Sequence, residues 1–154
     1  MKINIYEDPT IQEDYVTIYC SKKTSKIEEL QTLIEQKDNF PIIGMSENHT
    51  HLLQIDDILY FESVDKKCFA YLNTEVFQVD YTLKDLESVL MTKGFLRINR
   101  STIVNIYKID HIQFEYNMRI YAYLINKEKM IISRHYNKAF QANIQKIKSQ
   151  LLGG

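Results

Sequence analysis

Three clusters of basic and amide side chains have the chemistry needed to bind a nucleic acid. The clusters are Lys66 and Lys67, then Arg97, Asn99 and Arg100, then Arg134 and His135. Lysine offers phosphate a flexible point charge, whereas arginine can hold a phosphate or a guanine through two parallel hydrogen bonds. Asparagine and histidine can bond to base edges or to the nucleic-acid backbone. These residue types suit DNA binding if the fold brings the clusters to one surface; solvated loop ends are the alternative interpretation.

No enzyme site is evident in the sequence. The four glycines, at 44, 94, 153 and 154, cannot form a glycine-rich phosphate loop. Ser101 and Ser133 have no neighbouring base that would activate a hydroxyl group. The carboxylates are scattered, with no pair suited to acid–base catalysis. We therefore expect no enzyme activity, no cofactor and no small-molecule substrate.

His49 and His51 could in principle share a metal ion. Residues two apart in a strand face the same side, and Asp56 and Asp57 follow closely. Two imidazoles without further ligands at metal-binding spacing are a weak signal. An exposed strand edge or turn is the better interpretation, so no metal site is predicted.

The chain has eleven tyrosines, which could stack on bases. Their alternating positions, as at Tyr60, Tyr71 and Tyr121, favour packing in the core or on a sheet face instead. The basic clusters therefore lack an aromatic platform beside them. This disfavours single-stranded RNA as the ligand relative to duplex DNA.

The elements that must position the three clusters are mainly strands. Segments rich in β-branched and aromatic residues, separated by turn residues, predict strands at 41–45, 50–55, 58–64, 68–73, 75–80, 95–98, 102–106, 111–116, 118–125 and 130–134. These strands follow one another too closely for helical crossovers, so antiparallel pairing is expected. Each basic cluster then falls at the end of an element, where side chains can reach outward.

Two helices are predicted among and after these strands. Thr82 precedes Asp85 by three residues, a capping signal, and Lys93-Gly94 is a typical helix ending because glycine can adopt positive φ. A final helix is expected from about Tyr136 to Leu152. The apolar stripes are Leu83, Leu86, Val89 and Leu90 in the first helix and Phe140, Ile144, Ile147 and Leu151 in the second.

Residues 1–40 are predicted to form a short acidic extension of two strands and a helix. Residues 2–6 and 16–20 alternate between apolar and polar, the pattern of half-buried strands. Ser25 and Glu28 have capping-box spacing, and an apolar helical face follows them. The domain organisation is therefore expected to be 1–40 for the extension and 41–154 for the main domain, with the extension serving in dimerisation, docking or capping.

Charge is divided unevenly along the chain. Residues 1–62 carry five lysines against twelve acidic residues, a net charge of −7, whereas residues 63–154 carry fourteen basic residues against eight acidic ones, a net charge of +6. Such a split predicts that one surface meets a polyanion, although solvated faces that differ by chance remain an alternative.

The sequence also predicts a cytoplasmic protein. The first residues run directly into acidic groups, unlike a signal peptide, and no window approaches the ~20 apolar residues of a membrane helix. Cys20 and Cys68 each lie in an apolar strand-like run. We expect both to be buried, reduced thiols rather than a disulfide.

The stretch from Gly94 to Asn105, GFLRINRSTIVN, resembles the signature of LytTR DNA-binding domains, Phe-x-Arg-x-His-(Arg/Lys)-Ser-x-x-Val-Asn. Asn99 stands where histidine is usual. Segments 55–63, 81–90 and 131–136 are similar to the family's first strand, helix and final strand. The resemblance covers roughly residues 41–140.

The resemblance implies a mainly β fold with some α: an elongated domain of small antiparallel sheets, here preceded by the strand-strand-helix segment and ending in a C-terminal helix. It also implies that DNA is contacted by loops between strands, not by a recognition helix. The contacting loops would hold the three clusters named above. Lys66 would enter one major groove, Arg100 with Asn99 would lie across the backbone or minor groove, and Arg134 or His135 would reach the next major groove. Asn105 is expected to be structural, bonding to backbone near a turn.

A stand-alone LytTR transcription regulator without a receiver domain is thus the leading prediction, bound to double-stranded DNA as a homodimer on repeated half-sites. By family analogy, a membrane-protein partner is also implied. The alternative function is a protein-interaction module that docks a partner through the acidic extension.

Overall fold

The computed structural model describes residues 1–36 and 41–153, and the chain divides into two compact units, Met1–Asp38 and Asn39–Gly154. In the first unit, residues 1–24 contain no helix or strand, and one helix, α1 (Ser25–Gln36), follows. The backbone N–H of Glu28 donates to the carbonyl of Thr24 at 3.0 Å, which starts the helix. The predicted helix is therefore present in the extension.

The two strands predicted at 2–6 and 16–20 are wrong. Alternation indicates a strand only where a neighbouring strand takes the backbone hydrogen bonds and a core covers the apolar face. Neither condition holds here: Ile3, Ile5 and Tyr19 are 83 %, 84 % and 93 % exposed. Cys20, which we expected to be buried with this strand, is exposed, while Cys68 is buried and both thiols are free, as predicted.

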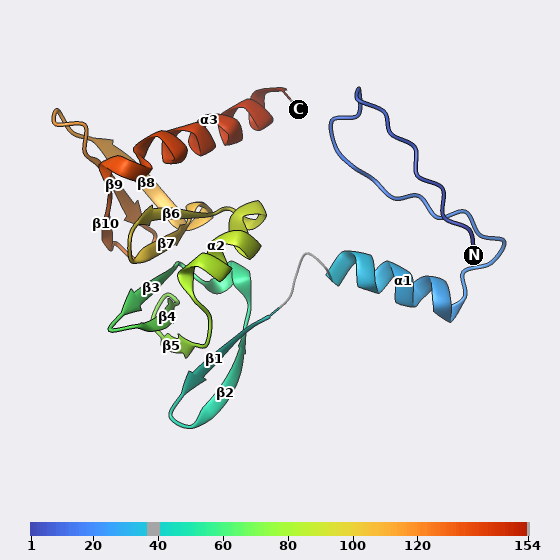
Figure 1. The fold of residues 1–154 in the computed structure, drawn as a ribbon, viewed down its shortest axis with the longest axis horizontal. Coiled ribbons are helices and arrows are strands. Elements are labelled where there is room, and N and C mark those ends of the chain that lie inside the picture. Colours follow the sequence, from blue (N-terminus) through green and yellow to red (C-terminus); the bar gives the residue numbers. More distant parts are fainter. Residues whose placement is uncertain (37–40, 154) are drawn as a thin grey trace. The chain divides into compact units, whose positions relative to one another are not determined.

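The second unit holds a seven-stranded, wholly antiparallel sheet (Figure 1). Its strands are β1 (Ile42–Ser46), β2 (His49–Leu53), β3 (Tyr60–Val64), β4 (Lys67–Tyr71), β5 (Val76–Val79), β6 (Phe95–Asn99) and β7 (Thr102–Asn105). They are hydrogen-bonded in the order β2-β1-β5-β4-β3-β7-β6. Tyr60 of β3 faces Tyr71 of β4 on one side and Val104 of β7 on the other. Because the two strands are antiparallel, the end of β3 lies beside the start of β7, where Glu62 pairs with Thr102.

A three-stranded antiparallel sheet follows, in the order β10-β9-β8. Its strands are β8 (Ile109–Phe114), β9 (Ile120–Leu124) and β10 (Lys129–Ile132). A 3₁₀ turn, Arg134–Tyr136, then leads into helix α3 (Asn137–Gly153). The prediction of a mainly antiparallel β fold with a C-terminal helix is confirmed.

Helix α2 (Leu83–Leu90) interrupts the strands between β5 and β6. It begins as predicted, because the Thr82 hydroxyl accepts the Asp85 N–H at 3.1 Å. Its buried residues Leu83, Leu86 and Leu90 pack on the seven-stranded sheet in a core with Phe61 and Phe95.

A second core joins the two sheets to α3. It contains Leu59, Ile98, Ile120, Ile132 and Phe140, with Ile144 packed at its margin. Ile98 of β6 is fully buried in this core. Leu151, which we also assigned to the apolar stripe of the last helix, lies outside the residues whose side chains are described. Within residues 1–36 and 41–153, no helix has both the length and the apolar character needed to cross a membrane.

Candidate nucleic-acid interface

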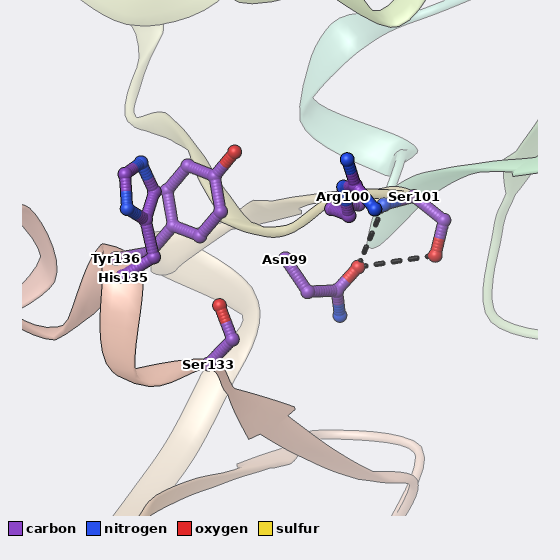
Figure 2. A pocket seen from close by; sticks show the side chains of 6 residues that line it. All are labelled: Asn99, Arg100, Ser101, Ser133, His135 and Tyr136. Carbon is purple, nitrogen blue, oxygen red and sulfur yellow. Dashed lines mark hydrogen bonds between the residues drawn. The ribbon is translucent and has the colours of Figure 1, made fainter.

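The turn between β6 and β7 lies at the centre of the predicted site. Asn99 ends β6, and its side-chain oxygen Oδ1 accepts hydrogen bonds from the Ser101 N–H at 2.9 Å and the Ser101 hydroxyl at 3.1 Å (Figure 2). The pairing of β6 with β7 shifts register between Arg97 and Asn99. This bulge and the Asn99 side chain together shape a tight turn with Arg100 exposed on it.

Arg97 is placed differently from the other basic residues. Its Nε donates to the carbonyl of Asn99 at 2.9 Å, and its Nη2 donates to the carbonyl of Arg100. Its Nη1 lies 3.3 Å from Oε2 of Glu87 on α2. The Arg97 side chain is only 18 % exposed. Its guanidinium group is thus directed at the backbone of the β6–β7 turn.

Two backbone hydrogen bonds tie this turn to the other two predicted loops. Ser63, at the end of β3, donates its N–H to the Ser101 carbonyl at 2.8 Å. Ser133, just before the 3₁₀ turn, donates its N–H to the Ile98 carbonyl at 2.8 Å. The β3–β4 loop, the β6–β7 turn and the Arg134–Tyr136 turn therefore form one connected set.

Two surface hollows lie along these loops. The larger, about 680 Å³, is lined by Asn99, Arg100, Ser101, Ser133, His135 and Tyr136. Figure 2 shows Arg100 and Ser101 on one side of it and His135 with Tyr136 on the other. The smaller, about 230 Å³, is lined by Ser63, Lys66, Cys68, Tyr81, Thr82, Leu83, Arg97 and Arg100. None of these described lining residues is acidic, so both hollows suit an anionic ligand.

The structure brings most of the predicted site residues together. Arg100 lines both hollows, with Lys66 and Arg97 in the smaller and Asn99 and His135 in the larger. The His135 ring packs edge-on against Tyr136, with centroids 4.9 Å apart.

Lys67 and Arg134 are exposed but line neither hollow. Lys66 occupies the β3–β4 turn, with φ of 65°, and Asp65 before it has φ of 50°. Val64 pairs with Lys67, so the connection is a two-residue hairpin turn. Lys67 is thus the first residue of β4 and not part of the hairpin tip.

Sequence reasoning missed several polar residues of these hollows. Ser101 and Ser133 were considered only as nucleophiles, although both directly adjoin a basic residue and line the larger hollow. The Ser133 hydroxyl can donate a hydrogen bond to an anion, whereas the Ser101 hydroxyl donates to Asn99. Ser63 and Tyr81 carried no signal, because they come from β3 and from the segment before α2. Only the fold shows that these segments meet.

Other sequence predictions are confirmed here. Asn105 is 3 % exposed; its Nδ2 donates to the Ile58 carbonyl at 2.9 Å and its Oδ1 accepts the Tyr107 N–H at 3.1 Å, a structural role. Tyr60 is buried and stacks on Tyr71 with ring centroids 4.3 Å apart. Burial raises the pKa of the Tyr60 hydroxyl well above its usual range. This tyrosine pair therefore packs within the protein.

The histidine pair lies on the edge strand β2, away from the basic loops in the hydrogen-bonding order. The His51 ring packs on Phe77 with centroids 4.8 Å apart, and the His49 ring is 6.4 Å from that of His51. In the part of the chain that the structure describes, no group of three or more His, Cys, Asp or Glu side chains could hold a metal ion.

The family model of the LytTr DNA-binding domain matches residues 48–145, more than half of the chain. The chain belongs to the LytTR family. The matched LytTR region contains α2, every strand of the two sheets except β1, the start of α3 and all seven predicted site residues. The recognition of the family from the GFLRINRSTIVN segment and its flanking blocks is thereby confirmed.

Relatives of this LytTR protein include HTH-type transcriptional regulators from Staphylococcus aureus, described as uncharacterised. Those of strains NCTC 8325 and MRSA252 are 26 % and 25 % identical to it over 145 residues, which is 94 % of this chain and 98 % of each relative. The similarity therefore extends beyond the LytTR domain into the N-terminal unit.

The fold is also similar to a solved structure, the LytTr DNA-binding domain of a protein described as a methyl-accepting/DNA response regulator from Bacillus cereus. The TM-score is 0.62, the identity is 23 %, and the match covers 75 % of this chain and 98 % of the other. Together with the family match, it identifies the second unit as a LytTR DNA-binding fold.

Proposed function

We propose that this LytTR protein is a sequence-specific, double-stranded DNA-binding transcription regulator that contacts successive grooves through its inter-strand loops. One observation carries the proposal: basic residues from three loops converge on two hollows whose described lining has no acidic side chain. A duplex presents phosphates along one face, and lysine and arginine binding to them release counterions. The family and its regulator relatives support the same function.

Each loop is assigned to a different part of the DNA duplex. Lys66, on the β3–β4 hairpin turn, reaches one major groove. Arg100 and Asn99, on the central β6–β7 turn, lie at the intervening backbone or minor groove. Arg134 or His135 reaches the next major groove. Lys67 adds charge beside Lys66.

The proposal assigns no reaction and no cofactor to the chain. It places the protein in the cytoplasm, where a bacterial-type regulator meets DNA, and it pairs two copies on repeated half-sites. Half-site spacing would then report the geometry of the homodimer.

The test begins with selection of duplexes from a random library by the full chain at near-physiological salt. Arg100→Ala is then expected to weaken binding to the enriched duplex about 5- to 150-fold, the usual range for loss of one arginine contact. Arg119→Ala is the matched control, because Arg119 is exposed in the β8–β9 connection and lines neither hollow. We expect it to change affinity less than about 2-fold.

Each variant should keep the unfolding midpoint of the parent, which shows that affinity is lost without unfolding. Equal effects of Arg100→Ala and Arg119→Ala would contradict the assignment of the central turn. Failure of the parent to enrich any duplex would contradict sequence-specific binding itself.

A second candidate function is the docking of a partner protein through the N-terminal unit. Its side chains Ile3, Ile5, Tyr6, Tyr15 and Val16 are all more than two-thirds exposed. Such exposed apolar groups are typical of protein-binding segments. Sedimentation equilibrium of the full chain and of Ile3→Asp/Ile5→Asp tests whether a second copy is that partner: a shift from dimer to monomer supports it, and an unchanged mass contradicts it.

A further inference from the structure

Arg97 differs from the other basic residues of the interface in what its guanidinium group contacts. Two of its nitrogens donate to the carbonyls of Asn99 and Arg100, the residues proposed to meet DNA. A third lies 3.3 Å from the Glu87 carboxylate. The exposed fractions of the Arg97 and Glu87 side chains are 18 % and 44 %. The bond to the Arg100 carbonyl is exposed, whereas the contacts with the Asn99 carbonyl and the Glu87 carboxylate are partly buried.

We propose that Arg97 and Glu87 are positioning residues for DNA binding: Glu87 orients the Arg97 guanidinium group, which holds the β6–β7 turn in its DNA-binding shape before DNA arrives. This inference rests on the proposed function, because it concerns the same turn. It assigns a role to α2, which contributes none of the proposed DNA-contacting side chains.

The geometry explains why the turn needs such support. The Asn99 side chain already holds Ser101 through two hydrogen bonds, but these satisfy only donors of Ser101. The carbonyls of Asn99 and Arg100 accept their side-chain hydrogen bonds from Arg97 instead. The turn that carries Arg100 is therefore held by two side chains, Asn99 through Ser101 and Arg97 through the Asn99 and Arg100 carbonyls.

A turn that is already ordered before binding improves affinity, because it loses little conformational entropy when DNA binds. Fixing one residue's backbone costs an amount equivalent to roughly 5- to 30-fold in affinity. Lysine cannot replace Arg97 in this role, since a single ammonium group lacks the planar fork that reaches separate acceptors. Arg97→Lys is therefore expected to weaken specific binding about 10-fold while keeping the charge.

Glu87 allows a test that separates a positioning role from a purely electrostatic one, because the two roles predict opposite changes in DNA affinity when the carboxylate is removed. DNA repels carboxylates, so removing one near the interface should strengthen binding if Glu87 acts only through its charge. If Glu87 positions Arg97, its removal should weaken specific binding instead. Asp85 is the matched control, because it lies on the same helix and has no side-chain ion pair or hydrogen bond among the interactions of the described residues.

The experiment measures fluorescence anisotropy with the duplex enriched by the full chain, for Glu87→Ala, Glu87→Gln, Arg97→Lys and Asp85→Ala. We expect Glu87→Ala to bind about 3- to 5-fold more weakly, since an ion pair with a half-exposed carboxylate is worth little by itself. Glu87→Gln retains an acceptor and should recover part of this loss. Asp85→Ala should bind equally well or more tightly. Tighter or unchanged binding by Glu87→Ala would overturn the proposal.

A second readout needs no DNA. In the free full-length protein, the {1H}-15N heteronuclear NOE of the Asn99, Arg100 and Ser101 amides should fall in Glu87→Ala and Arg97→Lys and stay at the parental value in Asp85→Ala. Unchanged NOE values in both Glu87→Ala and Arg97→Lys would overturn the positioning role even if the chain selected no duplex. Failure of the parent to select DNA would count against the proposed function alone. Glu87→Ala, at a half-exposed site, keeps the test decisive if Arg97→Lys does not fold.

Discussion

Replacing Asn105 with alanine should remove a buried side-chain link between distant segments of the LytTR domain. Asn105 ends β7, and its side chain joins the carbonyl of Ile58, 47 residues earlier, to the N–H of Tyr107. Asn105 and Ile58 are 3 % and 0 % exposed, so water cannot readily replace the lost donor. Tyr107 is 68 % exposed, so its N–H can be hydrated.

The size of the effect follows from these two contacts. The bond to Tyr107 contributes about 1 kcal/mol, and leaving the buried Ile58 carbonyl without its donor costs about 1–3 kcal/mol. The expected loss in the free energy of unfolding is therefore about 2–4 kcal/mol. For a unit of this size, such a loss lowers Tm by roughly 10 °C.

Urea unfolding of the full chain, followed by far-ultraviolet circular dichroism, measures this loss. Asn143→Ala is the control, because Asn143 makes one exposed side-chain bond within α3, to the Ala139 carbonyl at 2.8 Å. We expect it to change stability by less than about 0.5 kcal/mol. Asn105→Asp keeps the acceptor for Tyr107 but places an oxygen against the Ile58 carbonyl, so it should be at least as harmful as alanine. A loss below about 1 kcal/mol for Asn105→Ala would refute the reasoning.

Two further predictions concern thiol reactivity and backbone conformation. Burial raises the pKa of the Cys68 thiol to about 11, so Cys68 is almost wholly protonated at pH 8. A thiol reagent should therefore label the native protein only at the exposed Cys20. Rapid labelling of two thiols per native chain would contradict this. Gly94 has φ of 83°, and an added Cβ would clash with the Tyr107 ring, so Gly94→Ala should destabilise the fold by about 1–3 kcal/mol in urea unfolding. Adding Tyr107→Ala should recover only the part due to the clash, and full recovery would show that backbone strain is negligible.

The strands of the LytTR domain could be predicted from sequence because local signals and tertiary structure agree there. Alternating β-branched and aromatic residues between turn residues gave the positions of the strands within a few residues. Thr82 and Gly94 marked the beginning and the end of the α2 region, where the structure has a side-chain cap and a left-handed residue. The N-terminal segment shows the limit of such signals: residues 2–6 alternate as well, but no described strand pairs with them.

The sequence identified the three candidate clusters but not the contacts that bring them together. Basic residues at the ends of elements, together with the family signature, identified the three clusters. Their convergence depends on backbone bonds such as Ser63 N–H to the Ser101 carbonyl, between segments 38 residues apart, which no local pattern encodes. The sequence likewise could not show that the Arg97 side chain is directed at the backbone of its own turn. An arginine that binds its own turn and one that binds phosphate look the same in a sequence.

The positive φ of Lys66 limits which residues this position of the chain can accept. A residue in the second position of such a hairpin turn must tolerate a left-handed backbone, which valine, isoleucine and threonine do poorly. Substitution at this position is therefore confined mainly to glycine, asparagine, aspartate and unbranched side chains. A lineage that acquires a new binding preference can explore few chemistries there. Exposed positions with ordinary backbone angles, such as those of the 3₁₀ turn before α3, are freer to diverge between paralogues.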